Sequence, residues 1–188
     1  KSAYHVAQLA NALRGEEHDL PEVARLALLG LADQLAALST EIKSLDAQLL
    51  AWHRQSALSQ RLQTIPGVGV LTATAMAASI PDATLFRSGR QFAAFLGLVP
   101  KQNSSGGKER LGRISKMGDP YLRTLLVNGA TSVVRRIAQA EGQTAIWIRR
   151  LLEKKPTRLA TVAIANKTAR IVWAVMVRGE EYRRPAMG

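Results

Sequence analysis

The feature that most constrains the fold of this chain is a run of apolar residues spaced alternately three and four positions apart. A period of about 3.5 residues is the heptad pattern of a coiled coil. Such a helix winds around another helix in a left-handed supercoil. The partner is either a second copy of the chain or the weaker helix at Ser2–Leu13, and both options stay open at this point. We call the run the seam, and it consists of Leu28, Leu31, Leu35, Leu38, Ile42, Leu45, Leu49 and Trp52.

The rest of the chain has helical spacing and no convincing strand pattern. The long helix is expected to end at Thr64, and Asp119 followed by Pro120 is typical of a helix start, because the carboxylate can cap a helix whose first residue is Pro. We predict an all-α fold: a long coiled-coil helical arm over residues 1–62, then a compact basic helical domain over residues 63–188 with a long Gly/Ser-rich loop. The other expected helices are about Val70–Ser79, Gly89–Gly97, Gln143–Lys154 and Leu159–Arg178.

Positive charge is concentrated in the second part of the chain. The net charge is +12 over 188 residues, and residues 1–63 carry six cations against seven acids. The other 20 cations and seven acids lie in residues 64–188, which therefore carry +13. This imbalance predicts a polyanionic partner, most simply a nucleic acid. A membrane surface is a weaker candidate, because the cations are scattered rather than gathered on one amphipathic face. We also find no apolar run long enough to cross a bilayer, so no membrane partner is expected.

The composition gives little support to metal or disulfide chemistry. The chain has no Cys, which excludes disulfides and thiolate zinc sites. Its histidines, His5, His18 and His53, lie far apart without metal-ligand spacing, and we interpret them as surface or helix-face residues. We therefore expect no metal site within this chain. The first residue is Lys1 rather than Met, so we interpret the chain as a fragment of a longer protein.

A turn rich in Pro and Gly joins the long helix to the next one. Its sequence, Ile65-Pro66-Gly67-Val68-Gly69, is similar to the hairpin of helix-hairpin-helix modules. In such a hairpin, Gly67 and Gly69 let the backbone approach a phosphate of the nucleic acid. The alternative is an ordinary helix–helix turn in which a glycine supplies the left-handed cap.

The longest connection, from about Leu98 to Gly118, combines hydroxyls, glycines and cations. Connections of this length inside a compact domain are usually functional or disordered. A serine beside Gly106 and Gly107 could attack a phosphodiester in line, because glycines leave the nucleophile accessible and nearby cations stabilise the phosphate oxygens. The loop lacks the Lys-Ser or Lys-Thr pair of a nucleotide-binding P-loop. On residue types alone, a solvated turn is the simpler interpretation.

Three segments together resemble a known protein family. They are IPGVGVLTATAMAASI, FRSGRQFAAFLGLVPKQNSSGGKERLGRISKMGDPYLRTLLVNGA and ANKTARIVWAV. Their order and spacing over about Leu62 to Tyr182 are similar to the C-terminal transposase domain of DEDD-type insertion-sequence transposases. That group includes the bridge-RNA-guided recombinases and the Piv-type DNA invertases. The helix upstream of these segments also looks like the coiled-coil arm of the family.

The resemblance implies an active site divided between two domains. In the family, an N-terminal RuvC-like domain carries four acids that hold Mg²⁺, and the Gly/Ser loop carries a serine that forms a transient phosphoserine link with DNA. The position of that serine aligns with Ser105, and Ser104 is the second choice. We find no group of four well-placed acids in this chain. We therefore expect Mg²⁺ only with a missing RuvC-like domain, and we expect the fragment alone to be inactive.

The resemblance also implies partners. Family members bind DNA in the prokaryotic cytoplasm, the RNA-guided ones also bind a structured noncoding RNA, and they assemble as dimers or tetramers, for which the arm would serve. The competing hypothesis is a non-catalytic DNA- or RNA-binding and oligomerisation module in which the loop only holds phosphate. The cations that we expect to contact nucleic acid are Lys101, Lys108, Arg110, Arg113, Lys116, Arg123, Lys167 and Arg170.

Overall fold

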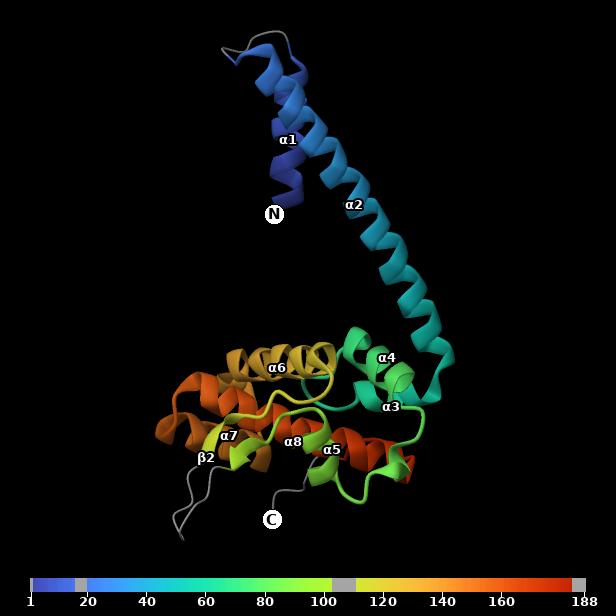
Figure 1. Cartoon of the computed structure of the whole chain (residues 1–188), viewed down its shortest axis with the longest axis vertical. Coiled ribbons are helices and arrows are strands. Elements are labelled where there is room, and N and C mark those ends of the chain that lie inside the picture. Colours follow the sequence, from blue (N-terminus) through green and yellow to red (C-terminus); the bar gives the residue numbers. More distant parts are fainter. Residues whose placement is uncertain (1, 16–19, 103–110, 184–188) are drawn as a thin grey trace. The chain divides into compact units, whose positions relative to one another are not determined.

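The computed structural model describes residues 2–15, 20–102 and 111–183 of the chain (Figure 1). It divides into two compact units, residues 1–51 and residues 52–188. The predicted all-α class is confirmed, since helices dominate the described residues and the sheet has two short strands. The elements are α1 (Ser2–Arg14), α2 (Glu22–Gln55), α3 (Ala57–Gln63), α4 (Val70–Ser79), η1 (Ala83–Leu85), α5 (Gly89–Phe95), β1 (Pro100–Gln102), β2 (Leu111–Ile114), α6 (Pro120–Arg135), η2 (Ile137–Gln139), α7 (Gln143–Lys154) and α8 (Thr157–Arg178).

The arm unit consists of α1 and most of α2. Ala10 and Leu13 of α1 are buried, and the Arg14 guanidinium lies 2.6 Å from the Asp33 carboxylate of α2. The seam residues from Leu28 to Leu45 nevertheless remain between 38% and 58% exposed. Within the described residues, α1 therefore leaves most of the seam open to another helix.

The long helix ends earlier than predicted. The expectation was one helix up to Thr64, but α2 ends at Gln55 and α3 begins at Ala57. Ser56 stands between them in extended backbone (φ −97°, ψ 102°), and its hydroxyl caps α3 by accepting a hydrogen bond from the Ser59 amide at 3.2 Å. The prediction of a continuous helix was wrong here, because a serine favours the N-cap position over the helix interior.

A buried histidine stabilises this break. His53, near the end of α2, is only 5% exposed, which corrects the interpretation of it as a surface residue. Its Nδ1 lies 2.7 Å from Ser59 Oγ, and its Nε2 lies 2.8 Å from Gln63 Oε1. A neutral imidazole satisfies both partners, with Nε2 donating to the amide oxygen and Nδ1 accepting from the hydroxyl. The polar groups at the break are therefore paired within the domain.

The domain is built around α8, which runs through its middle in Figure 1 and packs against α5 and α6. Small residues such as Ala165 and Ala169 are fully buried in α8 and allow this close packing. α3 packs against both α4 and α8, and Leu62 of α3 is fully buried. The compact unit accordingly begins at Trp52, upstream of the boundary between residues 62 and 63 that the sequence suggested.

The small β-ribbon was not predicted from the sequence. β1 and β2 pair in antiparallel fashion, with Pro100 opposite Ile114 and Gln102 opposite Leu111. Two residues of β2 face one residue of β1 between these pairs, so the ribbon contains a bulge. The ribbon escaped prediction because its strands are too short to establish an alternating pattern.

Two helices are long and apolar enough to cross a membrane, which corrects the expectation that no such run exists. They are α2 and α8, judged by length and composition among the described residues. A helix buried in a domain core passes the same test, and α8 lies in the core, with residues such as Ile164 and Val172 buried there. In α2, most of the large apolar residues form the heptad seam, and others such as Leu26 and Leu50 lie off it.

Candidate nucleic-acid interface

Two glycines bring the ends of the long loop together. Gly97 follows α5 and Gly118 precedes α6, and both have positive φ angles, 70° and 88°. A Cβ atom on Gly97 would collide with the Met117 backbone, and one on Gly118 would collide with the Phe95 carbonyl oxygen. Only glycine fits such a close backbone crossing. The loop is therefore closed at its base, which distinguishes it from a loose linker.

Side-chain hydrogen bonds attach this crossing to the core. Arg123 of α6 donates from Nη1 to the carbonyl oxygens of Leu96 at 3.1 Å and Met117 at 3.4 Å. Asn166 of α8 donates from Nδ2 to the carbonyl oxygen of Leu98 at 3.1 Å. Arg123 thus joins the two stems of the loop, and a contact of Arg123 with nucleic acid stays a prediction.

Three of the predicted cations border the base of the loop. The bulge sets Lys101 of β1 across from Gly112 and Arg113 of β2, and both cations are exposed. Lys116 has a φ of 55°, and its amide donates to the Gly97 carbonyl oxygen at 3.2 Å. The remaining predicted residues of the loop, Ser104, Ser105, Lys108 and Arg110, lie outside the described residues.

The turn between α3 and α4 packs against α6. Gly67 has a φ of 85°, and a Cβ atom there would lie 2.9 Å from the Gly129 carbonyl oxygen. Packing therefore suffices to explain why residue 67 is a glycine. Gly69 is exposed, and a Cβ atom on it would meet nothing within 4 Å. Of the two glycines predicted to contact phosphate, Gly69 has the open surroundings that such a contact needs.

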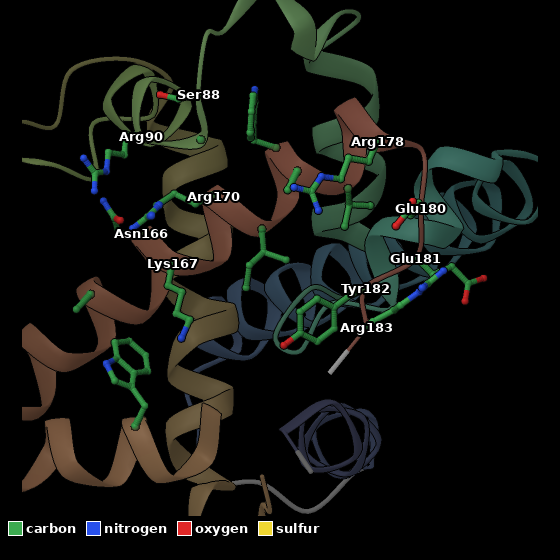
Figure 2. Close-up of a pocket in the computed structure, with 17 residues that line it drawn as sticks. Ser88, Arg90, Asn166, Lys167, Arg170, Arg178, Glu180, Glu181, Tyr182 and Arg183 are labelled. Carbon is green, nitrogen blue, oxygen red and sulfur yellow. The ribbon is translucent and has the colours of Figure 1, made fainter. Parts of the chain in front are cut away.

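An open groove of about 1210 Å³ lies on the domain between α5, α7, α8 and the residues that follow α8. Lys167 and Arg170, predicted as a second contact with nucleic acid, both line it (Figure 2). Three arginines that sequence reasoning missed line it as well: Arg90, Arg178 and Arg183. They come from the start of α5, the end of α8 and the segment beyond it, so no local pattern connects them.

The segment after α8 forms one wall of this groove and is tied to α3. Arg61 donates from Nη1 to the Gly179 carbonyl oxygen at 2.5 Å, and the Tyr182 amide donates to Thr64 Oγ1 at 3.0 Å. These bonds join positions 118 residues apart in the chain, so the wall is a feature of the tertiary fold.

The acidic residues of the described part of the chain form no metal site. No three His, Cys, Asp or Glu side chains come together there, so these residues do not fit the Mg²⁺ that the family resemblance implies. Asp82 has a local role instead. Hydrogen bonds from the Thr84 hydroxyl (2.6 Å) and the Thr84 amide (2.8 Å) lower the pKa of its carboxyl group. That carboxylate caps the short helix η1.

Comparison with known proteins identifies a protein family whose model covers the loop. The model of the family described as "Transposase IS116/IS110/IS902 family" matches residues 59–145. This segment contains the turn at Gly67, both stems of the loop and the Ser/Gly stretch between them.

Individual relatives agree with the family match. A probable family 20 transposase of Pseudomonas aeruginosa is 46% identical over 178 residues, which cover 95% of this chain and 53% of that protein. The transposase for insertion sequence element IS1328 of Yersinia enterocolitica is 37% identical over 90% of this chain and 51% of its own length. The transposase for IS1111A of Coxiella burnetii is 48% identical over 66% of this chain and 34% of its own length.

The chain spans about half, or less, of the length of these curated relatives. Its similarity to them extends beyond the loop, because the alignment with the Pseudomonas protein covers nearly the whole chain, arm included. The chain therefore belongs to the IS116/IS110/IS902 family of transposases.

Proposed function

We propose that this chain is the arm and C-terminal part of a transposase that cleaves and rejoins DNA, with Ser105 as the attacking group. The observation that carries the proposal is the closed base of the loop, where Gly97 and Gly118 cross within the segment that matches the transposase family. A nucleophile must be delivered to its phosphate in a defined geometry. A loop whose stems are fixed to the core meets that requirement better than a free linker does.

The proposed reaction exchanges a phosphodiester for a phosphoserine. The Ser105 Oγ bonds to phosphorus in line, the bond from phosphorus to a sugar oxygen of DNA breaks, and the serine proton passes to that oxygen. A second DNA hydroxyl then attacks the phosphoserine, which restores the serine and its proton. Lys101 and Arg113 supply positive charge for the phosphate oxygens from the base of the loop.

The test uses the full-length protein that contains this chain, with a nicked suicide DNA substrate that traps the covalent intermediate. Ser105→Ala should abolish both the protein–DNA adduct and strand exchange, while DNA affinity stays near that of the unmodified protein. Ser104→Ala is the matched control and should retain the adduct. An adduct that survives Ser105→Ala and disappears in Ser104→Ala would move the nucleophile by one residue. An adduct that survives in both variants would overturn the serine mechanism.

Self-association through the arm is a second proposed function, supported by the exposure of the seam. Six of its residues, from Leu28 to Leu45, are 38–58% exposed although they repeat with heptad spacing. A second copy of the same helix would bury them with matching spacing. We propose a dimer or tetramer in which the arm pairs with the arm of another copy.

The remaining partners are proposed on charge and family. The excess of 12 positive charges suits a polyanion. We propose DNA as the substrate and a structured noncoding RNA as a guide, with phosphate contacts fixing the register. The relatives are named as transposases of bacterial insertion elements, so we propose that this chain acts where bacterial DNA lies, in the cytoplasm. Mg²⁺ would have to be bound outside the described residues.

A further inference from the structure

Two groups of arginines in the domain differ in what their side chains contact. One group is used by the fold: Arg61, Arg123 and Arg149 each donate to backbone carbonyl oxygens. The other group borders the groove and has no side-chain hydrogen bond or ion pair within the described residues. Its members are Arg90, Arg170, Arg178 and Arg183. Unpaired guanidinium groups that converge on one groove are available to a ligand with several negative charges.

Figure 2 shows how these cations lie around the groove. Arg90, Arg170 and Lys167 are on one side of the view, and Arg178 and Arg183 are on the other, together with Glu180 and Glu181. The lining contains two acids, Glu180 and Glu181, against five cations. The groove is therefore net positive as a whole, and its charge is most positive around Arg90, Lys167 and Arg170. Cations on both sides of the groove favour an extended polyanion over a single small anion.

Aromatic side chains line the same groove. The Lys167 ammonium lies 4.2 Å from the centroid of the Trp147 ring, so a cation covers the ring in the free protein. Tyr182 is half-buried in the opposite wall. Trp173 differs from both, because its indole nitrogen donates to the carbonyl oxygens of Ala83 and Phe86 and so serves the core. Cations interleaved with aromatic rings are typical of sites for unpaired nucleotides.

The groove is preformed by contacts inside the domain. Gly89 lets α5 approach α8 so closely that a Cβ atom on it would lie 3.1 Å from Arg170 Cα. The opposite wall is held by the bonds from Arg61 and to Thr64. Its volume of about 1210 Å³ exceeds the range of about 300–1,000 Å³ that is usual for small-molecule sites. Those dimensions suit a segment of a polymer.

We propose that this groove binds a single strand of nucleic acid, with phosphates at the four unpaired arginines and a base stacked on Trp147 in place of the Lys167 ammonium. The inference rests on the proposed function only in that the protein handles nucleic acid. An unpaired base can reach an aromatic ring, whereas the bases of a duplex are stacked on each other and their faces are closed. The carboxylates of an acidic peptide could pair with the arginines, but such a peptide has no base to stack on the Trp147 ring.

The experiment uses this 188-residue chain and a fluorescent single-stranded DNA oligonucleotide, with fluorescence anisotropy as the readout at several salt concentrations. The variant Arg90→Gln with Arg170→Gln should weaken binding at least tenfold. It should also flatten the dependence of log K on log salt by about 1.4, the value for two lost phosphate contacts with a single strand. The matched control, Arg150→Gln with Arg158→Gln, removes two exposed cations outside the groove and should do neither.

The fluorescence of Trp147 gives a second readout, which binding of a polyanion without bases should not change. Single-stranded DNA should quench the fluorescence of Trp147, assigned by its loss in Trp147→Phe, and heparin, a polyanion without bases, should not. Trp147→Ala should weaken binding of the oligonucleotide about tenfold, in line with the loss of one stacked base. Thermal melting of each variant, followed by circular dichroism, would show that the domain still folds.

Three outcomes would overturn the proposal. They are equal losses in the groove and control variants, equal quenching by heparin and DNA, and competition by polyglutamate as strong as by the oligonucleotide, which would indicate a site for an acidic protein segment. Tighter binding of a duplex of the same length would point to duplex DNA and would count against the single strand. An RNA oligonucleotide of the same sequence distinguishes RNA from DNA as the source. All of these readouts are independent of Ser105, so either proposal can fail without the other.

Discussion

Two long apolar helices of this chain, α2 and α8, differ in how much of their apolar surface is buried. Of the most apolar 18-residue window of each, 6% is buried in α2 and 44% in α8. In α8, small and β-branched residues are distributed so that α3, α5, α6 and α7 can all pack against it. In α2, the seam residues from Leu28 to Leu45 stay exposed, as do other large apolar residues such as Leu26 and Leu50. Similar hydropathy therefore produces a core helix in one case and an exposed stripe in the other, depending on the spacing and size of the side chains.

The comparison predicts which property of the protein a substitution will change. A change in the seam should alter association between copies and leave the domain intact. A change beside α8 or at the crossing of the loop stems should alter the stability of the domain itself. Four predictions test this division, beginning with the one for which we expect the largest effect.

The double variant Leu38→Asp with Leu45→Asp should convert the assembled chain to monomer. A dimer buries four such leucines, each contributing about 1.5 kcal/mol or more, so the association free energy should fall by about 6 kcal/mol. Light scattering coupled to size-exclusion chromatography measures the mass. Gln34→Asp with Gln48→Asp, which adds the same charge off the seam, is the control and should keep the assembled mass. An unchanged mass in the seam variant would rule out the arm as the association device.

Gly118→Ala should destabilise the domain by about 3 kcal/mol or more. An alanine at a φ of 88° is strained, and its Cβ atom would collide with the Phe95 carbonyl oxygen unless the stems separate. Chemical unfolding followed by circular dichroism measures the free energy of unfolding. The mass of the assembled chain should stay the same if the arm is intact. A loss below about 1 kcal/mol would show that the crossing of the stems is not rigid.

Much of the domain was predictable because its helix boundaries have local causes. α4 and α7 begin and end where the sequence predicted, and Asp119 and Pro120 start α6, all through Gly, Pro and capping residues. The break at Ser56 was missed, because the seam dominates that stretch and one serine is a weak signal by itself. Most of the groove was missed, because Arg90 and Arg183 are 93 positions apart in the sequence. Their segments come together through the packing of α5 on α8 and through the bonds that tie the segment after α8 to α3.

Asp119→Ala should cost the domain about 1 kcal/mol. The Asp119 carboxylate accepts hydrogen bonds from the amides of Tyr121 at 2.7 Å and Leu122 at 3.1 Å at the start of α6. Loss of an N-cap of this kind typically costs about 1 kcal/mol. Asp119→Asn is the conservative control and should recover most of the stability. Chemical unfolding again measures the change, and equal losses in both variants would indicate that the charge matters and the cap does not.

The smallest expected effect comes from one substitution, glycine to alanine, made at two helical positions. One position lies in the exposed helix α2, and the other faces the core helix α8. Gly30 lies inside α2, and a Cβ atom on it would meet nothing within 4 Å. Alanine there should stabilise the arm by about 0.5–1 kcal/mol, since glycine is the poorer helix former.

Gly89, at the start of α5, faces α8, where a Cβ atom would lie 3.1 Å from Arg170 Cα. Gly89→Ala should therefore destabilise the domain, although the same methyl group is added to a helix. Hydrogen exchange of backbone amides follows arm and domain separately: protection should rise in α2 for Gly30→Ala and fall in α5 and α8 for Gly89→Ala. Equal signs at the two sites would mean that α5 can withdraw from α8 without cost, and the wall of the groove that α5 forms would then be adjustable rather than preformed.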